Sequence, residues 1–269
     1  LGALAARAGV ELETRPLEAP LLRLRGEERA GPAALAAMVE RPAALDRLCQ
    51  NLERQAGQAG LSHLLLPPVM GLHEWAEVHR RISQIRPSAE LLSGPPSVPG
   101  LRLQAALDSA LSRAGIALVH GRAVSLCSQG RRLTALVLSH GRELQGQAVV
   151  LATGKFIGGG LVHGKDGLGE PLAGLPVWAG RDGPNPPNPG KLMARQAHGP
   201  HPLFTAGLRV DPALRPLGRG GEPFMENLYG AGSVLGGYDY IAGRDGLGTA
   251  MITGHLAGQA AALGSGSAT

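Results

Sequence analysis

The chain has 269 residues, of which 43% are apolar, enough to build a substantial hydrophobic core. Its net charge is +5, but the basic residues are nearly all arginines scattered among acids, so we expect no nucleic-acid partner. Cys49 and Cys127 are too few and too far apart for an iron–sulfur cluster, so we expect reduced thiols in a cytosolic compartment and no metal site. No apolar run is long enough to span a bilayer, so any membrane contact is expected to come through a partner.

The sequence pattern of residues 1–115 predicts an α/β region, which forms part of the substrate-side lobe or of a segment that links to this lobe. The chain begins with Leu1 and not Met, and its first residues resemble the end of a helix followed by a strand-like stretch, so we expect a truncated N-terminus. Helical spacing, proline-started first turns and one short apolar run predict further elements. These are two helices over 32–59, a strand over 61–66, and helices over 73–83 and 99–114.

Residues 116–155 predict a β-rich segment, because the apolar period changes from helical to two after Gly115. Three strands are expected, over 116–130, 131–144 and 147–154. The last one ends in Ala-Thr-Gly, and small residues at the end of a buried strand let the backbone approach a flat ligand. A core strand that simply ends in a turn is an equally good interpretation of the pattern.

Residues 156–205 are expected to form a Gly/Pro-rich loop region, and a loop this long is usually functional or disordered. His163 and Lys165 follow its FIGGG turn, where they either contact an anionic substrate or flavin or are solvated loop charges. Arg209 lies in a strand-like stretch over 204–210. It either clamps a phosphate or pairs with Asp211.

Residues 206–269 hold the closing strand and helix. The ENLYGAGSVLGG stretch at 226–237 matches part of a dinucleotide-binding fingerprint, but no second strand with an acidic residue follows it, so we reject a phosphate cradle. We expect instead that the strand over 227–231 meets the amino end of a helix that begins near Leu247. The partial positive charge there suits a planar cofactor that becomes anionic on reduction, as flavin does. Such a charge is worth ~0.3–2 kcal/mol, or about 10–40 mV of flavin potential.

The expected cofactor-binding residues lie at the ends of two strands and at the start of the last helix. Asp239 is included because it can orient the glycine loop through an Asx turn. The full set is Ala152, Thr153, Gly154, Gly230, Ala231, Gly232, Ser233, Gly236, Gly237, Asp239, Leu247, Gly248 and Thr249.

Four stretches together resemble one family, that of the anaerobic glycerol-3-phosphate dehydrogenase B subunit, from about residue 10 to 262. They are PPSVPGLRLQAAL, VVLATGKFIGGGLVHGKDGLGEPLAGLPV, AGLRVDPALRP and ENLYGAGSVLGGYD. The resemblance implies an FMN- or FAD-dependent electron-transfer subunit of a glycerol-3-phosphate:quinone oxidoreductase, which converts sn-glycerol 3-phosphate to dihydroxyacetone phosphate. It also implies two partners, a separate catalytic subunit and an iron–sulfur, membrane-anchoring subunit that docks the complex at the cytoplasmic face of the inner membrane.

The expected fold is an α/β, Rossmann-like FAD/NAD(P)-binding flavoprotein fold that lacks its first βαβ unit and carries a second, substrate-side lobe. The family begins with a strand–loop–helix bearing GxGxxG, and this sequence has no such stretch. Two alternatives stay open. One is a flavoprotein of the fumarate reductase or succinate dehydrogenase type, and the other is a non-catalytic assembly subunit with a decayed flavin site.

Overall fold

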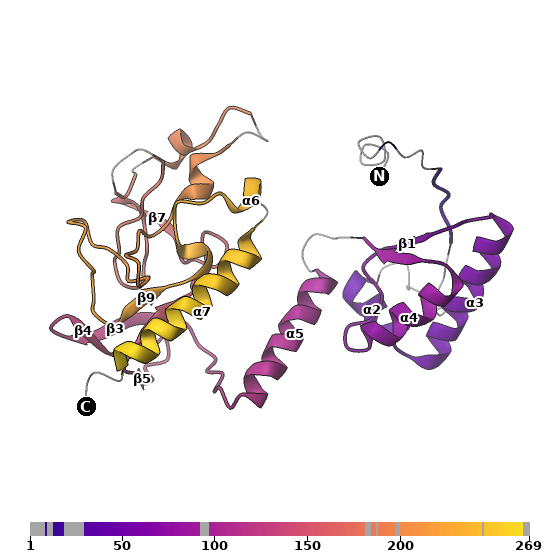
Figure 1. Ribbon diagram of the computed structural model, residues 1–269, viewed down its shortest axis with the longest axis horizontal. Helices are drawn as coiled ribbons and strands as arrows, with labels where there is room; N and C mark the ends of the chain where they lie inside the picture. The colour runs from indigo at the N-terminus through magenta and orange to yellow at the C-terminus, as the bar shows by residue number, and fades with distance from the viewer. Residues whose placement is uncertain are drawn as a thin grey trace. The chain divides into compact units, whose positions relative to one another are not determined.

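The computed structural model of the chain describes residues 9, 13–18, 30–91, 97–180, 184–186, 188–196, 200–243 and 245–265. It contains two compact units, Leu1–Val119 and His120–Thr269 (Figure 1). The buried apolar residues of the first unit and those of the second form separate clusters. The units are therefore described one at a time.

The first unit packs helices on a small parallel sheet. Its elements are α2 (Pro32–Val39), α3 (Pro42–Gln58), β1 (Leu64–Leu66), α4 (Trp75–Ile85), β2 (Ser88–Glu90) and α5 (Val98–Arg113). Apolar side chains of α3 recur at helical spacing, from Leu45 to Leu48 and Leu52, and pack with Val78 and Ile82 of α4. The predicted helices are confirmed, while the predicted strand over 61–66 is shorter. Most of the first 16 residues lie outside the described part, and residues 13–16 are not a strand.

The second unit begins with an antiparallel sheet of β3 (Ala123–Gln129), β4 (Arg132–Leu138) and β5 (Glu143–Gln145). Gly130, with a φ of 58°, forms the turn between β3 and β4. The predicted strand over 116–130 begins seven residues late. Its first residue in the ladder, Ala123, pairs with Leu138, the last residue of β4, so the preceding residues have no partner strand.

A parallel pair of strands forms the centre of the second unit. Val149 to Leu151 of β6 (Val149–Leu151) pair in register with Leu228 to Gly230 of β9 (Leu228–Gly230). The last helix, α7 (Gly246–Ser265), packs on both strands, and Figure 1 shows it in yellow beside β9. Its Ala257 is fully buried with Tyr229 and Ala231.

The stretch over 156–205, predicted as a loop, supplies much of the core of the second unit. It contains the hairpin β7 (Val162–Gly164) and β8 (Gly167–Gly169) and two 3-10 helices, η2 (Pro189–Leu192) and η3 (Pro202–Thr205). Its buried side chains include Leu161, Leu168, Leu175, Val177 and Leu192. Outside these short elements the described part of the stretch has no regular secondary structure, and its buried residues were not predicted because apolar residues in turns and short strands show no regular period.

The strand predicted over 204–210 is also absent. The proline at position 202 starts η3, and isolated bridges follow, from Gly207 to Trp178, from Leu208 to Leu235 and from Val210 to Pro216. A Cβ at Gly207 would overlap backbone atoms of Leu235 and Gly236. The backbone at Gly207 therefore packs closely against that of Leu235 and Gly236, and no continuous strand pairing forms here.

Candidate functional site

The closing strand and the last helix converge at a glycine turn. The Ala231 N–H donates to the carbonyl of Leu151 over 2.9 Å, which extends the pairing of β9 with β6. Gly232 then turns the chain with a φ of 70°, and its N–H donates to Thr253 Oγ1 of α7 over 2.8 Å. A Cβ added at Gly232 would lie 3.7 Å from the Ala250 Cβ. The predicted meeting of strand and helix is therefore present.

The first turn of α7 offers backbone donors beside this turn. The Thr249 N–H donates to the Asp245 carbonyl over 2.8 Å. The N–H groups of Leu247 and Gly248 find no acceptor among the described residues, as is usual at a helix start. These donors and the helix dipole favour a negatively charged group.

Asp239 forms the predicted Asx turn. Its Oδ1 accepts the N–H of Ile241 over 2.9 Å and that of Ala242 over 3.0 Å, and so starts the short helix α6 (Tyr240–Gly243). Asp239 thereby orients the segment that connects the glycine turn to α7.

The end of β6 is covered by glycine backbone. Thr153 Oγ1 is buried without a hydrogen-bond partner, and a Cβ at Gly160 would lie only 2.7 Å from it. On the other side, Ser233 Oγ lies 3.8 Å from the Cβ position of Gly154, which has a φ of 76°. Glycine at these positions lets the FIGGG turn and the turn after β9 approach the strand end, while Ala152 is exposed.

Two of the predicted glycines lie elsewhere. The Gly236 N–H donates to the Leu208 carbonyl over 3.0 Å, and the Gly237 N–H donates to the Thr205 carbonyl over 2.9 Å. Both glycines therefore pack on the segment over 205–208. Their assignment to the cofactor stays a prediction.

The candidate catalytic residues are not gathered at the strand ends. His163 lies in β7 and Lys165 in the following turn, both exposed on a hairpin whose strands pair with each other. Arg209 is exposed, and its guanidinium stacks on the Trp178 ring at 3.9 Å from the centroid. The expected alternative, a pair between Arg209 and Asp211, was wrong, because Asp211 pairs with Arg215 at 2.8 Å.

Sequence reasoning missed Lys155, which directly follows the Ala-Thr-Gly stretch. Only 6% of this lysine is exposed, and its Nζ donates to the Phe204 carbonyl over 2.7 Å. The Nζ also lies 5.3 Å from the ring centroid of Tyr238 and 5.4 Å from that of Tyr240. Burial lowers the pKa of Lys155 to about 8, although the nearby Asp239 carboxylate opposes this. Its position directly after the Ala-Thr-Gly stretch could have marked Lys155 as a site residue. We did not expect its burial, because lysine side chains are usually solvated.

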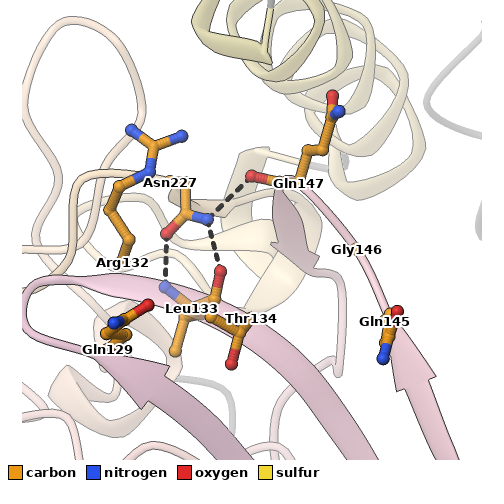
Figure 2. Close-up of a pocket in the computed structure, with 8 residues that line it drawn as sticks. All are labelled: Gln129, Arg132, Leu133, Thr134, Gln145, Gly146, Gln147 and Asn227. Carbon is orange, nitrogen blue, oxygen red and sulfur yellow. Dashed lines mark hydrogen bonds between the residues drawn. The ribbon is translucent and has the colours of Figure 1, made fainter. Parts of the chain in front are cut away.

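A separate hollow of about 540 Å³ lies between β4, β5 and the approach to β6 (Figure 2). Asn227 is one of the residues that line the hollow. The Asn227 side chain makes three hydrogen bonds, two with the Leu133 backbone and one with the Gln147 carbonyl. The asparagine thus joins β4 to the residues before β6. Because the buried Asn227 side chain already bonds to the backbone, it is not available to a ligand, and this hollow is a weaker candidate than the strand ends.

Metal chemistry has no counterpart in the described residues. No group of three or more His, Cys, Asp or Glu side chains there could hold a metal ion. Cys49 and Cys127 are half-buried free thiols, and burial raises the pKa of Cys49. Among the described helices, none has the length and apolar character needed to cross a membrane.

The chemistry at the strand ends fits a flavin. Glycine turns at two strand ends, a buried hydroxyl of Thr153 without a partner among the described residues, and helix N–H donors are groups that such a cofactor can use. In agreement, residues 10–248 match the family described as FAD binding domain. The chain belongs to this family of flavoproteins. Of the two flavins predicted, FAD is supported by the family.

The chain is also similar to curated proteins, and three of them are named as the B subunit of anaerobic glycerol-3-phosphate dehydrogenase, the Halobacterium salinarum protein with the qualifier "probable". It is 34% identical to the Halobacterium salinarum protein, over 73% of this chain and 46% of the relative. The Yersinia enterocolitica protein is 32% identical, over 91% and 57%, and the Vibrio cholerae protein 28%, over 83% and 50%. The chain thus spans about half the length of these relatives. No solved structure matches.

Proposed function

We propose that this chain is a flavin-binding, electron-transfer part of a glycerol-3-phosphate:quinone oxidoreductase, in the role of its B subunit. The reaction is the oxidation of sn-glycerol 3-phosphate to dihydroxyacetone phosphate. The names of the relatives support this substrate. The observation that carries the proposal is the bond from Gly232 to Thr253, which brings the end of β9 against the first turns of α7 in a chain of the FAD-binding family.

In this proposal the cofactor lies against the ends of β6 and β9. FAD supplies the capacity to take up a hydride equivalent and to pass electrons on singly or in pairs. Gly232, with a φ of 70°, turns the chain at the end of β9, and the amino end of α7 stabilises negative charge by ~0.3–2 kcal/mol. The backbone from Gly158 to Gly160 covers Thr153 and keeps water from the strand end.

We also propose that the fold is Rossmann-like and is completed by a strand–loop–helix unit of the kind that carries GxGxxG. Among the described strands, β6 pairs only with β9. Helix α7 is apolar around its circumference, with Met251, Ile252, Leu256 and Leu263 exposed. A helix that is apolar all round is normally buried. A strand beside β6 and a helix beside α7 would cover these surfaces.

The proposed assembly contains two further proteins, a catalytic subunit and an iron–sulfur subunit. The iron–sulfur subunit would hold the complex at the cytoplasmic face of the inner membrane and deliver electrons to quinone. The relatives' designation as a B subunit supports the existence of further subunits. Neither His163, Lys165 nor Arg209 is assigned a catalytic step.

Titration of the purified chain with FAD and with FMN tests the flavin part of the proposal. We expect the visible absorbance band of oxidised flavin to remain with the protein after gel filtration, more strongly with FAD. A protein that retains neither flavin, with or without an added strand–loop–helix unit, would instead favour an assembly subunit.

A dye-reduction assay tests the substrate. With the catalytic subunit present, sn-glycerol 3-phosphate should reduce the dye faster when this chain is added. Fumarate-dependent oxidation of reduced dye, without a response to glycerol 3-phosphate, would identify the fumarate reductase type instead.

A further inference from the structure

Lys155 is a buried cation that the flavin site described above does not use. Its aliphatic stem and ammonium lie between three segments, the end of β6, the carbonyl of Phe204 and the rings of Tyr238 and Tyr240. Taking an ammonium out of water disfavours its charged form, and this is the main cause of its lowered pKa. A charge kept in place against such a penalty is typical of functional sites.

The hydrogen-bonding capacity around this lysine is only partly used. An ammonium has three donors, yet Phe204 provides its only acceptor among the described residues. Tyr238, whose ring faces the ammonium, has a buried hydroxyl that finds no partner in the part of the chain that the structure describes. Asp239 is close enough to influence Lys155, but its Oδ1 accepts two N–H groups of α6. The Tyr238 hydroxyl and two of the three donors of the Lys155 ammonium therefore have no acceptor among the described residues.

We propose that Lys155 and Tyr238 are a donor pair that binds an anionic oxygen of a ligand at the end of β6. The ligand class is a phosphate ester, and both FAD and sn-glycerol 3-phosphate carry this group. The inference rests on the proposed function and adds to it two binding residues on separate segments. Lys155 follows β6, and Tyr238 lies between the last glycine turn and α6.

Binding measurements on three variants test the pair. Lys155→Met removes the cation but keeps an apolar stem, and Tyr238→Phe removes only the hydroxyl. Lys191→Met is the matched control, because Lys191 is an exposed lysine on η2. Isothermal titration gives the affinity for FAD and for sn-glycerol 3-phosphate separately. The thermal midpoint of each ligand-free variant reports stability.

We expect the affinity for one phosphate ester to fall at least about tenfold in Lys155→Met and about fivefold in Tyr238→Phe. The ligand affected identifies the source of the phosphate. The ligand-free midpoint of Tyr238→Phe should not fall, because the hydroxyl has no partner among the described residues, and that of Lys155→Met should fall by no more than the loss of one hydrogen bond, to the Phe204 carbonyl. Lys191→Met should change neither quantity.

Two results would overturn the pair. One is unchanged affinity for both ligands in Lys155→Met and Tyr238→Phe. The other is a loss of ligand-free stability as large as the loss of binding, which would make both residues structural. If the unaltered chain binds neither ligand, the proposed function fails. In that case inorganic pyrophosphate tests whether Lys155 and Tyr238 bind a phosphate group. If they do, it raises the thermal midpoint of the unaltered chain and not that of Lys155→Met, and any other result overturns the pair.

Discussion

The two units differ in how they use partly buried and buried polar groups. In the first unit, the Glu40 carboxylate accepts the N–H groups of Leu72, His73 and Glu74 at distances of 2.5–2.8 Å. Burial alone would raise the pKa of Glu40, but these three backbone bonds hold it below its ordinary value. The carboxylate is thereby committed to fixing the start of α4.

A second pair completes this arrangement in the first unit. Arg102 pairs with Glu90 at 2.6 Å, with 15% and 11% of the two side chains exposed, and it also donates to the Gly71 carbonyl. Glu90 accepts the Met70 N–H over 2.8 Å. Both charges are fully used to hold the chain between β1 and α4.

The second unit, in contrast, contains buried side-chain atoms that have no hydrogen-bond partner among the described residues. The buried side-chain atoms without partners, among the described residues, are Thr153 Oγ1, Trp178 Nε1 and Tyr238 Oη, and all belong to this unit. An unsatisfied buried group costs stability and so calls for an explanation. The contrast teaches that the charged groups named in the first unit serve the fold, while Thr153 Oγ1 and Tyr238 Oη in the second unit keep hydrogen-bonding capacity for a ligand.

Breaking the buried pair of the first unit should have the largest effect on stability. Arg102→Met leaves Glu90 buried without its cation, and we expect a loss of about 4 kcal/mol in the free energy of unfolding. Urea denaturation followed by circular dichroism measures it. Arg80→Met, which removes an exposed pair with Glu77, is the control and should have a much smaller effect, because solvent screens the exposed pair. Equal losses would show that the Arg102 pair is no more than a surface contact.

Raising the pH should stabilise the second unit through Lys155. The folded chain releases this proton near pH 8 and the unfolded chain near pH 10.5, so the unfolded state binds more protons between these values. Stability therefore rises with pH in this window, by about 1.4 kcal/mol per pH unit and about 3 kcal/mol in all.

The difference in the free energy of unfolding between the unaltered chain and Lys155→Met separates the effect of Lys155 from that of other titrating groups. Urea denaturation of both proteins between pH 7 and pH 10.5, at steps of about half a unit, provides it. A difference that does not change with pH would show that Lys155 is not buried in solution.

Gly207→Ala should destabilise the second unit by about 2 kcal/mol. The added Cβ would overlap the backbone of Leu235 and Gly236, so the two segments must separate. Gly254→Ala is the control, because a Cβ there meets open space in α7 and should add up to about 1 kcal/mol of helix stability. Thermal unfolding of both variants distinguishes these signs, and tolerance of Gly207→Ala would refute the close approach of the two backbones.

Removing the Tyr238 hydroxyl should have the smallest effect on stability, and of the opposite sign. Tyr238→Phe deletes a buried donor without an acceptor, and we expect a gain of about 1 kcal/mol in the ligand-free protein. Urea denaturation measures the change. A loss of stability would mean that the hydroxyl has a partner and that the contrast between the units is overstated.

The sequence predicted those parts of the fold that have a regular period. Helix α3 was predicted because Pro42 starts it and its apolar residues recur at helical spacing, and α4, α5 and α7 were predicted by similar reasoning. The convergence of β9 and α7 was predicted from glycine positions and the order of elements. The core residues Leu161, Leu168 and Leu175 were not predicted, because burial through turns leaves no period to detect.

Only those residues of the candidate site that lie in recognisable local motifs were predicted from the sequence. Thr153, Gly232 and Asp239 lie in recognisable turns, and the structure places them at strand and helix ends. Lys155 was missed because its environment comes from Phe204, Tyr238 and Tyr240, which are distant from it in sequence. Only the folded chain brings these groups together.

Hydrogen–deuterium exchange with and without FAD tests the central claim most directly, that the ends of β6 and β9 and the start of α7 hold the flavin. The account predicts slower exchange on FAD addition in the peptides that cover residues 149–155, 230–237 and 246–250, with little change in α3 and α4. Protection confined to the hollow around Asn227, or absent from those three peptides while FAD is bound, would contradict it.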